Sequence, residues 1–310
     1  MVQRMNGETA TPTTDVDVVV VGAGFAGMYM LHKLRSLKLS ARVIEAADDV
    51  GGTWYWNRYP GARCDITTAD YCYSFDPELE AAWTWSEKYA AQPEILRYAR
   101  FVAERYDLRR DIQFGTRVDQ ARWDEATGRW HIRTSRGETL TPRYFVMATG
   151  CLSVPKEPDI PGAGNFKGEV YLTGRWPHTE VDFSGKRVAV VGTGSSGIQA
   201  IPLIAQQAAQ LTVFQRTANF SIPARNGPVA AARLEQLKAD RNAYRQAAKR
   251  SRTGVPMPIN AVYGRYASPE VRAQRLKEGW ESGELIAATS IFADQGLFDL
   301  DVGGEVVVQV

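Results

Sequence analysis

Two glycine-rich segments of the chain have the spacing that accommodates a diphosphate. Gly22–Gly27 reads GAGFAG and Gly192–Gly197 reads GTGSSG, so both match Gly-x-Gly-x-x-Gly. The first glycine of this pattern allows a tight turn, the second lets a pyrophosphate approach the backbone, and the third lets a helix pack against a strand. The N–H groups that begin such a helix favour phosphate charge. One such segment is weak evidence, whereas two indicate a pair of dinucleotide sites.

The residues around both segments predict a strand, a tight turn and a helix, in that order. Apolar, β-branched runs precede the glycines at 15–21 and 186–191, as is typical of buried strands. Apolar residues then recur at helical spacing over Met30–Leu37 and Ile198–Ile204, although Pro202 lies within the second helix. We therefore expect an α/β fold with two Rossmann-like dinucleotide-binding domains.

The two predicted units differ at the residue that follows their second strand. The strand at 41–45 ends in Glu45, whereas the strand at 211–214 is followed by Arg216. A carboxylate accepts hydrogen bonds from ribose hydroxyls and repels a 2′-phosphate, whereas a guanidinium matches phosphate oxygens. The second site should therefore prefer NADPH, and the first should take a dinucleotide with an unphosphorylated ribose. Two such sites in one chain suggest hydride transfer from NADPH to FAD.

The composition narrows the possible functions. With 310 residues, 44% of them apolar and 23% charged, the chain has room for two domains of an ordinary globular kind. A formal net charge of +2 and no long apolar run make nucleic acid and membrane poor partners. The polar residues 1–14 contain no signal-peptide core and are expected to form a flexible tail.

The cysteines and histidines give no sign of a metal site or of a redox disulfide. Cys64, Cys72 and Cys151 form no CxxC pair, which favours free thiols in a cytoplasmic setting and argues against a disulfide reductase. A catalytic thiol is possible, but buried packing is the more frequent role of a free cysteine. The three histidines have no metal-ligand spacing. Without an internal disulfide, a reduced flavin would pass its electrons to oxygen or to a diffusible acceptor.

The segment between the two sites predicts a loop, a helix and a small meander. Residues 48–65 are rich in glycine and aromatic residues, which favours the wall of a cofactor cleft over a core-packing loop. A helix is expected at 92–106. Three short antiparallel strands are expected at 118–141, followed by a buried strand at 144–148. Pro- and Gly-rich residues at 153–168 then indicate a linker.

A further segment resembles a known family. Phe166–Pro177 reads FKGEVYLTGRWP and is similar to the fingerprint F-x-G-x-x-x-H-x-x-x-W-P of flavin-dependent Baeyer–Villiger monooxygenases, with matches at Phe166, Gly168, Trp176 and Pro177. The segments 51–56, 58–65 and 192–199 look like the same family, closest to its phenylacetone and steroid monooxygenase branch. The resemblance covers about 16–293 and makes the chain similar to the N-terminal part of that family.

The resemblance implies a reaction and one catalytic residue. NADPH would reduce FAD, O2 would add to form a C4a-peroxyflavin, and this would convert a ketone into an ester or lactone. Asp65 matches a family aspartate that orients a catalytic arginine near the flavin, and the cation would stabilise the developing negative charge. The alternative for Asp65 is a loop carboxylate that caps nearby N–H groups. The oligomeric state and the particular ketone stay open.

The residues that we expect to bind the cofactors lie at several points between Gly22 and Thr217. They are Gly22, Gly24, Phe25, Ala26, Gly27, Glu45, Gly52, Thr53, Trp54, Trp56, Arg63, Asp65, Tyr71, Val118, Thr149, Gly150, Gly192, Thr193, Gly194, Ser195, Ser196, Gly197, Gln199, Arg216 and Thr217.

The resemblance also implies a domain order. We expect a tail at 1–14, part of an FAD-binding domain at 15–150, a linker with the fingerprint at 151–184, part of an NADP-binding domain at 185–228, part of a helical insertion at 229–300 and an atypical tail at 301–310. Residues 229–252 hold seven Lys/Arg and two acids, which favours a solvated helical face over an anionic partner.

The chain departs from the family pattern in two ways. Leu172 stands where the fingerprint has histidine, so a polar contact is lost and we expect slower turnover with NADPH rather than loss of flavin. His178 lies six positions further on and is not an evident substitute. From the resemblance, we expect that nothing after Pro228–Gly283, which resembles part of the insertion, closes either nucleotide fold. Two alternatives therefore stay open: a truncated, non-catalytic flavin-binding fragment, and a flavin monooxygenase that oxidises nitrogen or sulfur.

Overall fold

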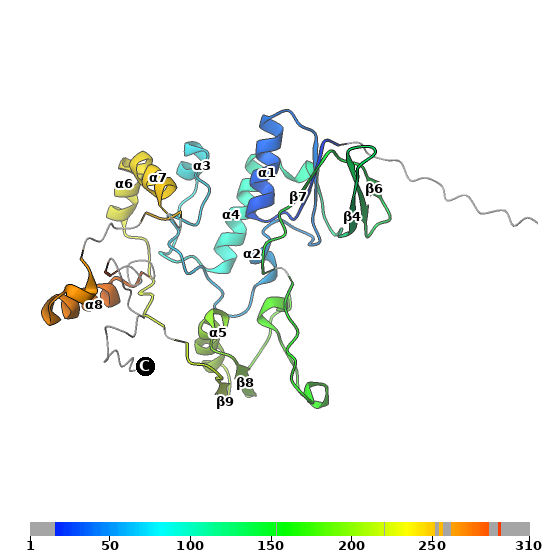
Figure 1. The fold of residues 1–310 in the computed structure, drawn as a ribbon. Helices are drawn as coiled ribbons and strands as arrows, with labels where there is room; N and C mark the ends of the chain where they lie inside the picture. Colours follow the sequence, from blue (N-terminus) through cyan, green and yellow to red (C-terminus); the bar gives the residue numbers. More distant parts are fainter. Residues whose placement is uncertain are drawn as a thin grey trace, which may run out of the picture. The chain divides into compact units, whose positions relative to one another are not determined.

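The computed structural model describes residues 16–152, 154–219, 221–251, 254–256, 262–284 and 291–292. The chain divides into two compact units. The first unit comprises Met1–Tyr59 and Ile95–Val181, and the second comprises Pro60–Glu94 and Asp182–Val310. Figure 1 shows the elements of both. The expected domain boundaries stay predictions, and the tails expected at 1–14 and 301–310 lie outside the described residues.

A parallel sheet of four strands is the centre of the first unit. Its order is β3-β2-β1-β7, with β1 (Val18–Val21), β2 (Ala41–Ile44), β3 (Ile112–Gln113) and β7 (Tyr144–Met147). β1 pairs with β2 on one side and with β7 on the other. These strands confirm the expected α/β pattern. The expectation that the strand at 144–148 is buried is wrong, because β7 has one neighbour in the described sheet and Met147 is 73% exposed.

The two faces of this sheet are covered by different layers. The helices α1 (Phe25–Ser36) and α4 (Gln92–Arg105) pack on the face that carries Val18, Val20 and Val43. The opposite face, with Val19 and Ile44, packs on the antiparallel meander (Figure 1). That meander consists of β4 (Val118–Asp124), β5 (Arg129–Thr134) and β6 (Thr139–Leu140), as the turn residues predicted. Alternation along β1 thus buries its side chains on both faces, which explains its continuous valine run.

The remaining elements of the first unit are short. They are α2 (Thr53–Trp56), η1 (Arg109–Asp111), η2 (Ala163–Asn165) and η3 (Thr173–Arg175). The segment 48–65 is therefore not all loop, since α2 forms one helical turn within it. The proline-rich segment that follows β7 contains the single turn η2 and no strand among its described residues, and its role as a linker stays a prediction.

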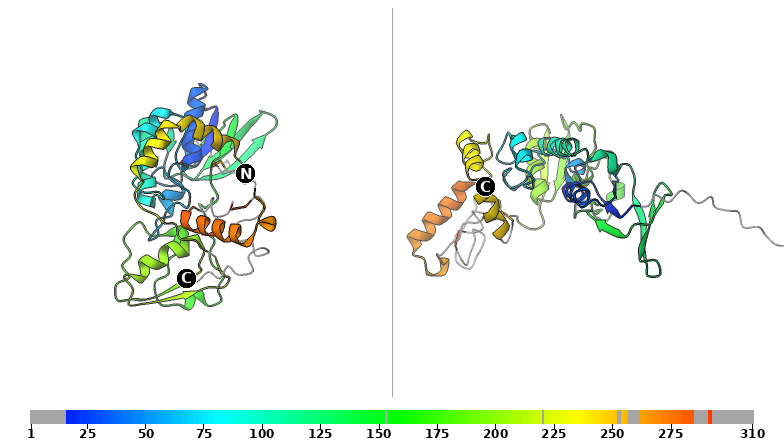
Figure 2. Two further views of the ribbon diagram at one scale, coloured as in Figure 1. Left: turned by 90° about the vertical axis from the view of Figure 1, so that its left-hand side faces the viewer. Right: turned by 90° about the horizontal axis from the view of Figure 1, so that it is seen from above.

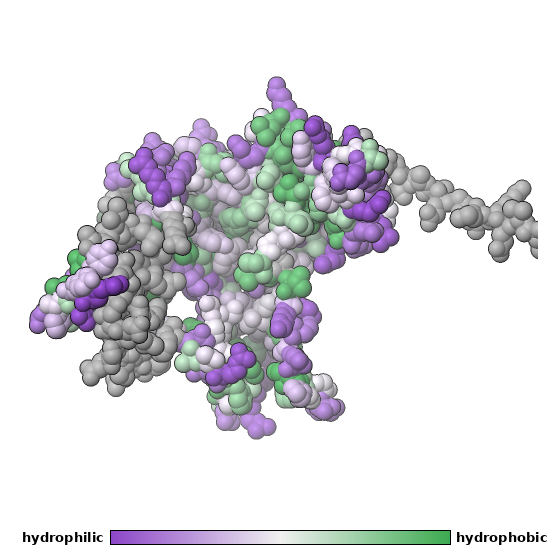
Figure 3. All heavy atoms as spheres, viewed as in Figure 1, coloured by the Kyte–Doolittle hydropathy of each residue, from purple (hydrophilic) through white to green (hydrophobic). Residues whose placement is uncertain are grey.

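The second unit contains the other glycine turn. The strands β8 (Arg187–Val191) and β9 (Gln210–Phe214) pair in parallel, and α5 (Ser195–Ala205) connects them. This is the second predicted strand–turn–helix–strand unit, with Pro202 inside α5 as expected. Its sheet is far more open to solvent than the first, because Val191 is 72% exposed and Phe214 is 56% exposed. Figure 3 shows hydrophobic side chains at the surface around β8 and β9.

Helices make up most of the rest of the second unit. They are α3 (Pro77–Ala82), α6 (Ala231–Ala239), α7 (Arg241–Arg250), η4 (Gly264–Tyr266) and α8 (Pro269–Ser282). Figure 2 shows α8 (orange) along its length. A serine cap begins α8 and Gly283, in a left-handed conformation, ends it. The regular elements among the described residues of 229–300 are thus helices, and their assignment to a helical insertion stays a prediction.

A buried carboxylate joins two of these helices. Glu80 on α3 forms ion pairs with Arg241 at 3.1 Å and Arg245 at 2.7 Å on α7, and its side chain is only 7% exposed. Two arginines of the basic segment 229–252 therefore bind within the unit rather than face solvent, which corrects the expectation for them. No helix in the described part of the chain has the length and hydropathy to cross a bilayer.

Candidate functional site

The first glycine turn leads from β1 into α1. Gly22 has φ +102°, and a Cβ atom there would lie 2.6 Å from the carbonyl oxygen of Ala148. A Cβ atom on Gly27 would lie 1.8 Å from the carbonyl oxygen of Gly22. Neither position can hold a side chain without moving backbone, so the tight turn and the close helix–strand packing that the sequence predicted are both confirmed. Thr149 also lies at this turn, because its Cα is 3.6 Å from the position that a Cβ atom on Gly22 would take.

A second pair of glycines packs directly against this turn. Gly51 and Gly52 both have positive φ, and a Cβ atom on Gly52 would lie 2.8 Å from the Cα of Gly24. Two chain segments thus approach each other backbone to backbone at the point where a pyrophosphate would bind. The helix α2 follows at once. Its Trp54 is buried, as the alternative of a core-packing loop predicts for this segment, whereas Trp56 is partly exposed.

Glu45 holds the backbone of the first turn. Its side chain is 5% exposed, and its two carboxylate oxygens accept hydrogen bonds from the N–H of Ala23 at 2.6 Å and of Ala47 at 2.7 Å. Sequence reasoning expected a ribose acceptor here and missed this backbone role. The two functions are compatible, because each carboxylate oxygen can accept more than one hydrogen bond.

The second glycine turn has the same backbone but more open surroundings. Gly192 has φ +102°, and a Cβ atom on Gly197 would lie 2.4 Å from the carbonyl oxygen of Gly192. By contrast, a Cβ atom on Gly192 or Gly194 would meet nothing within 4 Å. The hydroxyl of Thr193 accepts a hydrogen bond from Gln215 at 2.7 Å, a contact that the motif did not predict. The surface at Gly192 and Gly194 is therefore open.

The other candidate residues of the second unit divide into exposed and anchored ones. Arg216 and Thr217 follow β9 and are exposed, so their side chains are accessible to a ligand. Arg63 is anchored instead: its guanidinium donates to a carboxylate oxygen of Glu87 at 2.8 Å and to the carbonyl oxygen of Tyr89 at 3.0 Å. That partnership holds the pKa of Glu87 below its ordinary value of 4.5.

Asp65 has one side-chain partner that its sequence position did not reveal. Its Oδ1 atom accepts a hydrogen bond from the Nε2 of Gln199 at 2.9 Å. Burial raises the pKa of Asp65, and the hydrogen bond from Gln199 acts in the opposite direction. The structure therefore brings a predicted catalytic residue into contact with a predicted cofactor-binding residue.

The candidate residues form two groups that follow the two units. The first unit holds Gly22, Gly24, Phe25, Ala26, Gly27, Glu45, Gly52, Thr53, Trp54, Trp56, Val118, Thr149 and Gly150. The second unit holds Arg63, Asp65, Tyr71, Gly192, Thr193, Gly194, Ser195, Ser196, Gly197, Gln199, Arg216 and Thr217. Tyr71 lies in a turn, where its N–H donates to the carbonyl oxygen of Thr67. Val118 begins β4, and Gly150 has φ +67°. Their cofactor contacts stay predictions.

The fingerprint segment includes a contact that the sequence did not suggest. Leu172 directly precedes η3, and Trp176 is buried with its ring 5.4 Å from that of Tyr171. The ring of His178 lies edge-on to that of Tyr55 at 4.9 Å, so this histidine contacts α2. Burial and the positive charge of Arg58 lower the pKa of His178, so it is neutral near pH 7. The spacing between Leu172 and His178 in the sequence does not reveal this contact.

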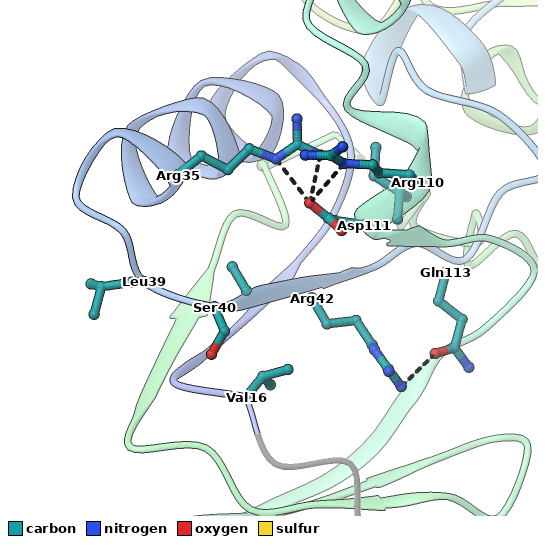
Figure 4. A pocket seen from close by; sticks show the side chains of 10 residues that line it. Val16, Arg35, Leu39, Ser40, Arg42, Arg110, Asp111 and Gln113 are labelled. Atoms are coloured by element: carbon teal, nitrogen blue, oxygen red, sulfur yellow. Dashed lines mark hydrogen bonds and ion pairs between the residues drawn. The ribbon is translucent and has the colours of Figure 1, made fainter.

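A separate cavity of about 570 Å³ lies away from these residues. Figure 4 shows it where β2 and β3 begin, whereas ligands of such sheets bind beyond the carboxyl ends of the strands. Arg35, which lines it, is committed to the carboxylate of Asp111 and to the carbonyl oxygens of Tyr106 and Asp107. None of the candidate cofactor-binding residues lines this cavity, so we do not assign a cofactor to it.

Two of the three cysteines are poor candidates for sulfur chemistry. All three are free: Cys64 is buried, and Cys151 is exposed. Burial raises the pKa of Cys64 to about 11, and it also raises the pKa of Cys72. These two thiols are therefore protonated near pH 7 and poor nucleophiles. Within the described ranges, no group of three or more His, Cys, Asp or Glu is arranged to hold a metal ion.

Comparison with known proteins agrees with the two glycine turns. Residues 19–252 match the family described as pyridine nucleotide-disulphide oxidoreductase. The chain belongs to this family. The match spans both strand–turn–helix units, although no cysteine pair accompanies them among the described residues.

Individual relatives confirm the resemblance to Baeyer–Villiger monooxygenases. A Baeyer–Villiger monooxygenase of Pseudooceanicola batsensis is 44% identical over 276 residues, which are 89% of this chain and 50% of that protein. The phenazine N-monooxygenase PhzNO1 of Lysobacter antibioticus is 43% identical over 271 residues, 87% of this chain and 50% of that protein. The solved structure of an oxidized steroid monooxygenase bound to NADP has a TM-score of 0.83 and 53% identity, and covers 86% of this chain and 51% of that one. The chain thus spans about half the length of these relatives.

Proposed function

We propose that this chain is the nucleotide-binding part of an FAD- and NADPH-dependent monooxygenase that inserts one oxygen atom of O2 next to a ketone carbonyl to give an ester or lactone. The observation that carries the proposal is the presence of two separate glycine turns in one chain, followed by Glu45 in one unit and Arg216 in the other. The Baeyer–Villiger relative and the NADP-bound steroid monooxygenase support it.

We assign FAD to the first turn. A pyrophosphate would lie against the backbone of Gly24 and Gly52, which approach each other with no side chain between them, and Glu45 would accept from the ribose hydroxyls. FAD, when bound, would supply the redox chemistry that activates O2. The residues of this chain contribute the binding, the orientation and the fixed charges around it.

We assign NADPH to the second turn. Gly192 and Gly194 leave open space for the pyrophosphate, and the exposed guanidinium of Arg216 would bind the 2′-phosphate. Asp65 takes the catalytic role that the family resemblance implies. Its carboxylate would orient a cation that stabilises negative charge developing on the substrate.

Oxidation of a ring nitrogen is the second candidate reaction. It is favoured by the identity of 43% with a phenazine N-monooxygenase, a relative nearly as similar as the Baeyer–Villiger monooxygenase. We also propose a cytoplasmic location, supported by the three free thiols, and no nucleic-acid partner, supported by the net charge of +2.

One set of measurements on the purified chain tests the proposal. Bound FAD is measured by its visible absorbance, NADPH oxidation is followed with and without a ketone, and products are identified by mass spectrometry. Ketone-stimulated oxidation with an ester or lactone product supports the proposal, and loss of that product in Asp65→Asn supports the assigned role. An N-oxide from phenazine selects the second candidate. Flavin binding without any product would select a non-catalytic flavin-binding role.

A further inference from the structure

Gln199 occupies a position that links the second glycine turn to Asp65. The helix α5 begins at Ser195, so Gln199 lies just over one turn from the start of that helix at the Gly192–Gly197 turn. The Gly192–Gly197 turn and Gln199 thus belong to the same continuous turn and helix. A short segment, 61–65, runs past the helix at this point.

The segment 61–65 fits closely against α5. Gly61 has φ +80°, and a Cβ atom there would lie 2.3 Å from the carbonyl oxygen of Gln199. On its other side the segment is held by backbone hydrogen bonds, from the N–H of Gln92 to the carbonyl oxygen of Ala62 and from the N–H of Cys64 to that of Ala90. The backbone that carries Asp65 is thus clamped between α5 and the chain at 90–92.

The side-chain amide of Gln199 makes three hydrogen bonds to this segment. Its Oε1 atom accepts from the N–H of Arg63 at 3.2 Å. Its Nε2 atom donates to the carbonyl oxygen of Arg63 at 3.2 Å and to Oδ1 of Asp65 at 2.9 Å. A flipped amide would face donor with donor and acceptor with acceptor, so these partners select one orientation. The amide binds the backbone with two hydrogen bonds and directs the third at the carboxylate.

We propose that Gln199 is a positioning residue that fixes the Asp65 carboxylate to the helix beginning at the nucleotide turn. The inference rests on the proposed function in one respect, since the carboxylate must take part in the reaction for its position to matter. Gln199 favours the ionised, oriented form of Asp65, because a hydrogen bond from an amide N–H stabilises a carboxylate. A nucleotide that orders the start of α5 would thereby also order Asp65.

The test uses the 310-residue chain labelled with ¹³C at the aspartate carboxyl carbons. The Asp65 signal is assigned by its disappearance in Asp65→Asn and followed as a function of pH. Gln199→Met keeps the length of the side chain and its helix propensity but removes the amide. Gln199→Glu keeps the shape but places a second carboxylate opposite the first. Gln206→Met is the matched control, because Gln206 follows α5 and is exposed.

The proposal expects the titration midpoint of Asp65 to move upward in Gln199→Met, to move further upward in Gln199→Glu, and to stay in place in Gln206→Met. A purely structural role would not produce this order between two variants of similar size. An unchanged midpoint in both Gln199 variants, or equal shifts in the control, overturns the proposal.

A second measurement separates positioning from direct nucleotide contact. The motif predicted Gln199 as a cofactor contact, but its amide bonds to Arg63 and Asp65. A positioning residue should therefore leave the NADP⁺ affinity of Gln199→Met, followed by tryptophan fluorescence, within about threefold of wild type. A loss of more than about tenfold together with an unchanged Asp65 titration would make Gln199 a nucleotide contact and overturn the inference. The Asp65 titration needs no cofactor. The proposed function can therefore fail, with no FAD bound and no NADPH oxidised, while the titration still decides the role of Gln199.

Discussion

Two alanine substitutions in the second glycine turn, three positions apart, should affect different properties: one should lower the stability of the fold and the other the affinity for NADP⁺. In Gly197→Ala the new methyl group would lie 2.4 Å from the carbonyl oxygen of Gly192, and this backbone neighbour cannot swing away as a side chain could. Overpacking of this kind costs roughly 1–3 kcal/mol. In Gly194→Ala the backbone is extended at φ −68° and ψ −177°, and the methyl group meets nothing within 4 Å, so the loss should stay below about 1 kcal/mol.

Gly194→Ala, the variant that should fold almost normally, should lose NADP⁺ affinity. The methyl group of Gly194→Ala occupies the open space that would admit a pyrophosphate, so NADP⁺ affinity should fall at least about tenfold in a well-folded protein. Urea midpoints from circular dichroism measure folding, and tryptophan fluorescence measures NADP⁺ affinity. Gly227→Ala is the control, because its methyl group also meets nothing within 4 Å but lies in another segment. Wild-type affinity in Gly194→Ala, or a wild-type urea midpoint in Gly197→Ala, would refute the assignment of this turn.

Three further substitutions test charges that the structure places in the second unit. Arg216→Ala should weaken NADPH binding by roughly tenfold to a hundredfold in a fluorescence titration, because a charge-assisted contact to the 2′-phosphate is lost, and should leave NADH binding unchanged. Equal affinities of the wild type for NADPH and NADH would contradict the role of Arg216. Glu80→Gln should lower the free energy of unfolding, measured in urea, by about 3 kcal/mol, because it leaves two guanidinium groups without their buried partner. Glu281→Gln is the control: it breaks an exposed ion pair and should cost less than about 0.5 kcal/mol. The ion pair with Arg63 lowers the pKa of Glu87, so its contribution to stability is complete above the ordinary pKa of 4.5 and is lost as pH falls through the lower folded pKa. The gap in urea midpoint between wild type and Glu87→Gln should therefore close as pH falls below 4.5, and a constant gap would contradict the ion pair.

Local patterns in the sequence predicted the conformation of the two glycine turns well. A run such as Val18–Val21 has no reason to alternate when both faces of its strand are buried, and the glycines that follow are required by close backbone contacts around the turn. A similar locality explains the meander, where short strands pair across turns at 124–128 and 135–137. These elements depend largely on near neighbours, and near neighbours are visible in a sequence.

Contacts between distant residues could not be predicted in the same way. Gln199 binds Asp65 and Glu80 binds Arg245 across long stretches of chain, and no periodicity or spacing relates the members of either pair. The mixed charges of 229–252 suggested solvation because a helical face alone does not reveal which neighbour it packs against. His178 shows the same limit, because its distance from Leu172 is counted along the chain, whereas its neighbour in space is Tyr55.

The two turns share a motif but differ in how far their surroundings protect a ligand. At the first turn Gly24 is covered by Gly52, the strand that leads into the turn is buried, and Glu45 is 5% exposed. At the second turn the space before Gly194 is open, the strand ends at an exposed Val191, and Arg216 is exposed. The chain spans about half the length of its relatives, so the openness of the second turn does not distinguish the two cofactors. The assignment of FAD to the first turn and of NADPH to the second rests on Glu45 and Arg216.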